Sequence, residues 1–235
     1  MSFDDAFKEK EIKDNNKRIK VMVAIPHMGW ITVGLETKIA HWITESDYDI
    51  EQFFSTVKPT YANRNIIAKK FLDSDCDYLL SIDSDVVPTT NPLKLIEHGV
   101  DIVGGVYPTW KDENYLWLAV WRDTDGSYKQ YVLSERKGLK EVDALGTGCL
   151  LTSRKVIEAL PAPFVDKVRD EIGDRELGHD LYFCLRAKDR GFKVYADFDI
   201  VCDHVKELPL IPVINTINEA FKEGYEKGKK EGLAQ

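Results

Sequence analysis

The sequence lacks the features of a membrane or secreted protein. No apolar run approaches the roughly 18 residues that span a bilayer, and residues 1–18 alternate charges without the apolar core of a signal peptide. The four cysteines are far apart and form no C-x-x-C pair, which favours buried free thiols over a disulfide or zinc framework. These absences predict a cytoplasmic protein without a transmembrane segment.

Basic residues are also in short supply. The 235-residue chain has 32 Lys and Arg against 40 Asp and Glu, which leaves a net charge of -8. Because phosphate backbones are bound by basic surfaces, a nucleic-acid partner is disfavoured. The remaining composition, 43% hydrophobic and 31% charged, is that of a globular protein and excludes whole-chain disorder, collagen and coiled coil. The length fits one α/β domain.

The first half of the chain alternates strand and helix patterns. Strands are predicted at 19–25, 50–56, 78–82 and 101–106. The run 78–82 has almost no polar alternation, which a parallel strand covered on both faces requires. Helices are predicted between these strands, over 33–45, from Thr60 with Ile66, Ile67 and Phe71 on one face, and over 92–97. This alternation is typical of an α/β protein with a Rossmann-like open sheet.

The second half predicts shorter elements. Asp125-Gly126 is a hairpin turn signal, with strands over 116–121 and 128–133 on either side. Further along we expect a strand over 141–145, a glycine turn at 146–148, a helix over 153–160, a helix carrying Leu177, Leu181, Cys184 and Leu185 that ends at Gly191, and two short strands near Val194 and Ile200. We divide the chain into a charged N-terminal extension (1–18), one domain (19–206) and a C-terminal amphipathic helix (207–235).

The C-terminal helix carries one apolar stripe. Ile214, Ile217, Phe221 and Tyr225 recur at helical spacing, and charged residues fill the other side. We expect this stripe to pack on the domain. Two alternatives are a homo-oligomer contact between copies of the helix and a contact with a membrane surface.

Asp83 and Asp85 are the strongest chemical signal. They follow the predicted strand 78–82, and alternate residues of a strand point to one side, so the spacing predicts two carboxylates aimed at one point. Ligands of open α/β sheets bind at the carboxyl ends of strands. Carboxylates there suit Mg²⁺ or Mn²⁺ together with substrate phosphates. A solvated acidic turn is the alternative for this motif alone.

Several segments in register resemble the GT-A glycosyltransferases, especially family-2-like enzymes with a D-x-D motif. They span most of residues 19–206: Asn63-Arg64-Asn65, Tyr78 to Asp85, Gly146 to Leu151, Gly178-His179-Asp180 with Phe183-Cys184 and Gly191-Phe192, and Asp203-His204. The chain departs from the pattern at Asn63, where Ala is usual, and at His179, where Glu is usual. The second departure weakens the assignment of Asp180.

The resemblance implies a fold and an activity. The expected fold is α/β, a GT-A (Rossmann-like) open mixed sheet with helices on both faces. The expected activity is metal-dependent transfer of a hexosyl group from a UDP- or GDP-sugar to an acceptor hydroxyl, with inversion. A shell of oxygen and imidazole ligands favours Mn²⁺ slightly over Mg²⁺.

The resemblance also implies roles for individual residues. Asp83, Asp85 and His204 are the expected metal ligands, and Asp180 is the expected general base. The nucleotide sugar is expected to contact Pro26, His27, Arg64, Asp83, Ser84 and Lys206. The acceptor side is expected to include Trp110, Gly148 and His179.

Rival functions stay open at this point. A nucleotidyltransferase should carry a glycine-rich loop with a basic residue after the first strand, and Pro26-His27-Met28-Gly29-Trp30 does not supply one. A sugar-nucleotide-binding module without activity is a second rival. The acceptor itself is open, and a modified nucleobase is a minority candidate because the chain is acidic.

Overall fold

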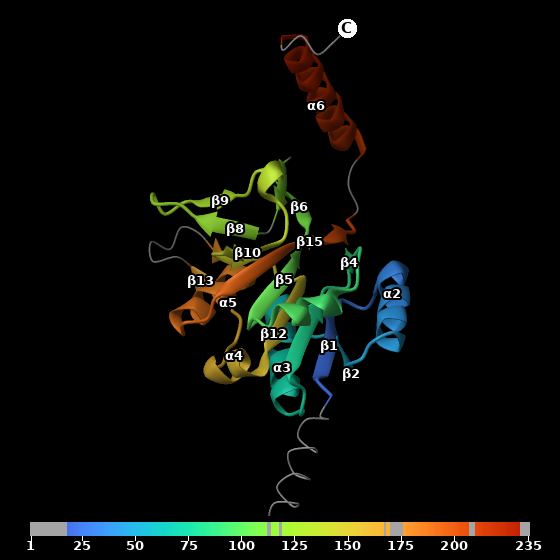
Figure 1. The fold of residues 1–235 in the computed structure, drawn as a ribbon, viewed down its shortest axis with the longest axis vertical. Helices are drawn as coiled ribbons and strands as arrows, with labels where there is room; N and C mark the ends of the chain where they lie inside the picture. The colour runs from blue at the N-terminus through green and yellow to red at the C-terminus, as the bar shows by residue number, and fades with distance from the viewer. Residues whose placement is uncertain are drawn as a thin grey trace, which may run out of the picture.

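The computed structural model describes residues 18–111, 114–117, 119–166, 168–169, 176–206 and 210–230. Its centre is an eight-stranded sheet in the order β10-β15-β5-β12-β3-β1-β2, with β4 paired to β15 (Figure 1). These strands are β1 (Lys20–Pro26), β2 (Asp49–Ser55), β3 (Tyr78–Ile82), β4 (Val86–Pro88), β5 (Ile102–Val106), β10 (Leu139–Val142), β12 (Cys149–Ser153) and β15 (Val194–His204). The helices are α2 (Val33–Thr44), α3 (Thr60–Leu72), α4 (Arg154–Ala159), α5 (His179–Asp189) and α6 (Leu210–Lys230), with 3₁₀ helices η1 (Pro92–His98) and η2 (Leu133–Glu135).

The sheet mixes strand directions. β1 runs parallel to β2 and β3, and β15 runs parallel to β5. β12 lies between β3 and β5 and is antiparallel to both, and β10 is antiparallel to β15. The open mixed sheet expected from the sequence is therefore confirmed. Short strands lie outside it: β6 (Pro108–Lys111) with β7 (Asn114–Trp117), β8 (Ala119–Arg122) with β9 (Tyr128–Gln130) and β11 (Ala144–Leu145), and β13 (Val168–Arg169) with β14 (Glu176–Leu177).

Helices cover both faces of the sheet, which explains the unbroken apolar run of β1. Val21, Val23 and Ile25 pack in a core cluster with side chains of α2 and η1. The alternate residues Met22 and Ala24 belong to a second cluster, with side chains of α3, α4 and α5. Burial on two faces removes the polar positions that a one-sided strand would show.

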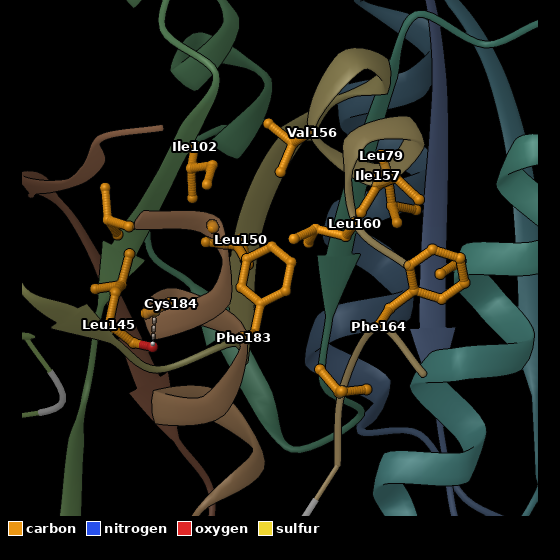
Figure 2. Close-up of a cluster of buried hydrophobic side chains, with 14 of the residues drawn as sticks. Leu79, Ile102, Leu145, Leu150, Val156, Ile157, Leu160, Phe164, Phe183 and Cys184 are labelled. Carbon is orange, nitrogen blue, oxygen red and sulfur yellow. Dashed lines mark hydrogen bonds between the residues drawn. The ribbon is translucent and has the colours of Figure 1, made fainter. Parts of the chain in front are cut away.

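Figure 2 shows part of the second cluster. Leu79 and Leu150 from the sheet face Ile157 and Leu160 of the α4 segment, and Phe183 of α5 lies among them. The Cys184 thiol, also in α5, donates to the Leu145 carbonyl at 3.7 Å. This layer fixes α5 against the sheet, and the first turn of α5 carries His179 and Asp180.

Several sequence expectations are wrong in detail. Ile66 is exposed, because α3 turns Ile67, Ala68 and Phe71 toward the sheet instead. One continuous strand, β15, replaces the two strands predicted near Val194 and Ile200; a shift in register interrupts its pairing with β5. Leu177 belongs to β14 and not to the α5 helix. The strand β12 was not predicted, since no element was assigned between the glycine turn at 146–148 and the helix expected from residue 153.

The C-terminal helix is not packed on the domain. In Figure 1, α6 lies apart from the body, beyond the edge of the sheet at which β15 ends. Its apolar side chains, including Ile214, Phe221 and Tyr225, are exposed. The expected packing of this stripe on the domain is therefore wrong. Among the helices of the described residues, none combines the length and apolar character needed to cross a membrane.

Candidate active site

One cavity of about 300 Å³ gathers most of the predicted site residues. It opens at the carboxyl ends of β1, β3 and β15, the edge at which open α/β sheets bind ligands. Its walls are formed by Pro26, His27, Met28, Trp30, Thr60, Asn63, Asp83, Ser84, Asp85, Tyr107, His179, Asp180, His204 and Lys206. Of the predicted residues whose side chains are described, Arg64 and Gly148 are absent from this wall. The side chain of Trp110 lies outside the described part of the structure.

Asp83 and Asp85 line the same cavity but bind different neighbours. β3 ends at Ile82, and the chain then makes a tight turn, in which the Val86 amide donates to the Asp83 carbonyl at 2.9 Å. The turn breaks the strand alternation on which the prediction relied. Within the described part of the chain, no three carboxylate, thiol or imidazole groups are placed to hold a metal ion together.

Asp83 is held by Arg64. The Nη2 atom of Arg64 donates to both Asp83 carboxylate oxygens, at 2.7 and 2.8 Å, and Nη1 donates to Ser81 Oγ at 3.2 Å. Burial raises the pKa of Asp83, and Arg64 partly offsets this, while Asp180 and Asp85 raise it further. Arg64, which is buried beneath the cavity, therefore balances the charge of the half-buried Asp83 carboxylate.

Asp85 faces His204 and Lys206. The Asp85 Oδ2 atom lies 3.5 Å from His204 Nε2, and Lys206 Nζ donates to the same oxygen. Burial would raise the pKa of Asp85, but these two neighbours outweigh it and lower the pKa to about 2. The main chain joins them as well, since the Val205 amide donates to the Asp85 carbonyl at 2.8 Å.

The imidazole of His204 is oriented as a metal ligand would be. Its Nδ1 atom lies 3.0 Å from the Pro108 carbonyl, which can only accept, so Nδ1 donates there and Nε2 is the ring nitrogen that faces Asp85. The ring also packs edge-on against Tyr107 at 5.2 Å. Two atoms 3.5 Å apart can both reach one divalent cation at about 2.1 Å from each. Asp85 and His204 thus fit a cation as a pair, without Asp83.

Asp180 lies at the start of α5, where the helix dipole favours a negative charge. His179 Nε2 lies 2.9 Å from Asp180 Oδ1, and the Thr147 hydroxyl donates to the same oxygen. Burial would raise the pKa of Asp180, but His179, Arg64 and Thr147 together lower it to about 2. Asp180 is therefore ionised at neutral pH and aligned by two donors.

Gly148 packs tightly behind the D-x-D turn. Its carbonyl accepts from the Asp83 amide at 2.9 Å, and its amide donates to the Tyr107 hydroxyl at 2.8 Å. A Cβ at this position would lie 2.7 Å from the Tyr107 Oη atom, closer than carbon and oxygen pack. The geometry gives Gly148 a supporting place behind the cavity rather than a place in its wall.

The loop after β1 forms the opposite wall. Thr32 donates to the Ser84 carbonyl from both its amide and its hydroxyl, at 3.1 and 3.2 Å, which ties the loop to the D-x-D turn. Trp30 is 53% exposed at the cavity. Below it, the Asn63 amide nitrogen donates to the Ser55 carbonyl at 2.9 Å. The amide oxygen of Asn63 is buried and has no hydrogen-bond partner among the described residues.

A second cavity of about 230 Å³ shares Asp180 with the first. Its wall is mostly apolar: Val120, Tyr128, Ala144, Leu145, Gly146, Gly178 and Leu181 accompany Asp180. Asp180 therefore contributes to a polar cavity and to an apolar one. This position allows Asp180 to contact one substrate in the polar cavity and a second substrate in the apolar cavity.

Sequence reasoning missed Tyr107, Thr147 and Trp30 as specific participants. Tyr107 directly follows β5, so its position at a strand end was a usable signal. Thr147 lies inside the glycine turn that was singled out, where only the glycines were weighed. Trp30 lies in the loop that was expected to receive the nucleotide.

Comparisons with known proteins bear on the fold. The sequence matches no protein-family model and no curated protein. The crystal structure of A197 from STIV matches with a TM-score of 0.57 at 22% identity, over 80% of this chain and 87% of that chain. The two chains share a fold.

More distant structures also match. GalNAc-T7, crystallised with UDP, GalNAc and Mn²⁺, has a TM-score of 0.48 at 11% identity, over 83% of this chain and 45% of that chain. UDP-glucose pyrophosphorylase complexed with UDP-glucose has a TM-score of 0.43 at 10% identity, over 88% of this chain and 100% of that chain. Likeness at this level identifies no activity for the present chain.

Proposed function

We propose that this chain is a metal-dependent glycosyltransferase of the GT-A type. It moves a hexosyl group from a UDP- or GDP-sugar to an acceptor hydroxyl, with inversion at the anomeric carbon. The observation that carries the proposal is the cavity at the strand ends, in which the Asp85–His204 pair and the His179–Asp180 pair line the same space. The Asp85–His204 pair can hold a metal ion beside the diphosphate, and the His179–Asp180 pair can remove a proton from the acceptor.

Asp85 and His204 are the proposed ligands of Mn²⁺ or Mg²⁺. When bound there, the ion supplies positive charge to the departing diphosphate. Lys206, now paired with Asp85, contributes a second positive charge that can turn to the phosphates. Arg64 is a positioning residue in this proposal, because it holds Asp83 and the turn that aims Asp85.

The nucleoside is proposed to occupy the wall made by His27, Trp30 and Asn63. The exposed indole of Trp30 offers an apolar face for a base. The side-chain oxygen of Asn63 has no hydrogen-bond partner among the described residues, so it can accept from an N–H group of a ligand. Every base carries an N–H donor on its pairing edge, at a ring nitrogen in uracil and guanine and at an amino group in cytosine and adenine. The Asn63 oxygen can therefore accept from any of them, and the choice of a UDP- or GDP-sugar rests on the family resemblance alone.

Asp180 is the proposed general base for the acceptor hydroxyl, which approaches from the second cavity. The apolar wall of that cavity favours an acceptor with an apolar group beside the hydroxyl. A charged polynucleotide acceptor fits this wall poorly. His179 is the alternative base, since it also lines the first cavity and shares a hydrogen bond with Asp180.

The test is a panel of UDP- and GDP-sugars incubated with the protein and Mn²⁺, with nucleoside diphosphate release measured. Release of UDP or GDP that disappears with EDTA is expected. Formation of sugar nucleotide from sugar phosphate and nucleoside triphosphate, with pyrophosphate as product, would identify a nucleotidyltransferase instead. Binding without turnover, with every acceptor class tried, would identify a binding module. The cytoplasmic location expected from the sequence stays a prediction.

A further inference from the structure

The helix α6 presents an apolar face that no described part of the chain covers. Its large apolar side chains are between 47% and 75% exposed: Ile211, Ile214, Ile217, Phe221 and Tyr225. At about 100° per residue, Ile214, Ile217, Phe221 and Tyr225 fall within roughly 80° of one another. Exposed apolar residues aligned in this way mark an interaction surface.

Six of the seven charged residues of α6 have described side chains, and these six are sorted around this face; the seventh, Lys230, occupies a position on the far side. On a helix of about 3.6 residues per turn, Lys222, Lys227 and Lys229 lie roughly 80–120° from the centre of the apolar face, and on both of its sides. Glu219, Glu223 and Glu226 lie about 140–160° from the centre, on the far side of the helix. All six side chains are exposed.

The positions of the lysines and glutamates distinguish between a second α6 helix and a lipid surface as the partner of the apolar face. In a pair of α6 helices, the flanks of one apolar face meet the flanks of the other. Because both flanks carry lysine, a parallel or an antiparallel pair brings lysine against lysine. A lipid surface instead receives flanking lysines at the level of its headgroups, while their aliphatic stems lie along the acyl boundary. Phe221 and Tyr225 suit the same boundary.

We propose that α6 docks its apolar face on an anionic lipid surface. Anionic headgroups complement the flanking lysines, and the glutamates stay in water on the far side. The helix leaves the body at the sheet edge where β15 ends at His204 (Figure 1), so docking brings the cavity edge near the lipid surface. The inference goes beyond the proposed chemistry, and its test needs no catalysis.

The experiment is flotation of the full chain with vesicles of phosphatidylcholine alone or with 30% phosphatidylglycerol added. Binding to the anionic vesicles is expected, with weak binding to the neutral ones and loss of binding at high salt. Phe221→Glu should reduce binding at least tenfold. The matched control Glu223→Gln, on the far side of the same helix, should bind as the parent does. Both residues are exposed, so neither change disturbs the packed core.

A second variant tests the charge argument separately. Lys222→Gln with Lys229→Gln should weaken binding to anionic vesicles by about fivefold per lysine and leave binding to neutral vesicles unchanged. Absence of flotation by the parent chain with anionic vesicles overturns the proposal. So does light scattering that shows a dimer which Phe221→Glu converts to monomer, because a second copy would then cover the face. Sugar-nucleotide hydrolysis without vesicles should be equal in the parent and all variants.

Discussion

At the scale of single residues, the site consists of carboxylates with assigned neighbours. Asp83 is bound to Arg64, Asp85 to His204 and Lys206, and Asp180 to His179 and Thr147. The sequence could place these carboxylates at the site, because strand ends and helix starts determine which edge they occupy. The sequence could not show which neighbour each carboxylate binds. For Asp83 and Asp85, this depends on a turn at Ser84 that interrupts the alternation of β3.

Replacing the proposed base tests the Asp180 assignment. Asp180→Asn keeps the side-chain shape but removes the proton acceptor, so transfer to acceptor should fall by roughly 10²- to 10⁴-fold. Binding of the sugar nucleotide with metal should survive, because neither depends on this carboxylate. Transfer kinetics and calorimetry on the same preparation measure the two effects.

Two further measurements test His179 as the base and the stereochemistry of transfer. If His179→Ala removes the rate and Asp180→Asn does not, the base is His179. Retention of anomeric configuration, observed by NMR of the product, contradicts direct displacement for both residues.

The metal prediction concerns Asp85 and His204. Asp85→Asn or His204→Ala should weaken Mn²⁺ binding by about 10-fold or more, in the range seen when groups around a metal are lost. The matched control is Asp203→Asn, an exposed carboxylate next to His204 that does not line the cavity. Calorimetric titration of Mn²⁺ in the presence of UDP measures this affinity. If all three variants bind Mn²⁺ as tightly as the parent does, neither Asp85 nor His204 is a metal ligand.

At the scale of elements, strands with uniform apolar runs were predictable, and strands defined by their neighbours were not. β1 and β3 are covered on both faces and show this in their composition. β12 is only five residues long and follows a glycine turn, so its own sequence does not separate it from that turn. It becomes a strand because β3 and β5 leave a gap of one strand between them.

The fit of β5 in the sheet depends on Gly104. A Cβ at this position would lie 2.5 Å from the Cys149 carbonyl oxygen of β12, and backbone cannot yield as a flexible side chain can. Gly104→Ala should therefore lower the free energy of unfolding by roughly 1–3 kcal/mol, the usual cost of overpacking.

Gly34 of α2 provides the comparison for this change. A Cβ at Gly34 meets nothing within 4 Å, so Gly34→Ala should leave the protein equally stable or stabilise it by about 0.4–1 kcal/mol. Urea denaturation of the two variants and the parent gives both values. Equal midpoints for Gly104→Ala and the parent would contradict the close approach of β5 and β12.

At the scale of the whole molecule, the site assembles from segments far apart in the chain. Trp30, Asp85, Asp180 and His204 converge because β1, β3, α5 and β15 all end or begin at one edge of the sheet. Strand order follows from tertiary packing, so the sequence could identify this edge but not which side chains meet across it. The separation of α6 from the body was beyond sequence reasoning for a related reason: periodicity defines an apolar face but not what covers it.

Assembly of the site makes whole-molecule stability sensitive to acid. The pKa of Asp180 is about 2 in the folded chain against an ordinary value of 3.8. A carboxyl group whose pKa is lowered by folding stabilises the folded state above its unfolded pKa, and this contribution is lost as the pH falls through the folded value. Asp180 should therefore contribute its full stabilisation above about pH 4 and none below about pH 2.

Comparison of the parent with Asp180→Asn isolates this contribution, because asparagine does not titrate. The difference between their free energies of unfolding should be constant above about pH 4 and should shrink as the pH falls toward 2. Urea denaturation at a series of pH values between 2 and 6 measures it. Asp180 also raises the pKa of Asp83, so a smaller part of the pH dependence of this difference comes from Asp83 and has the opposite sign. A difference that stays constant down to pH 2 would show that folding does not lower the pKa of Asp180, and His179 and Thr147 would then not stabilise its ionised form in the folded chain.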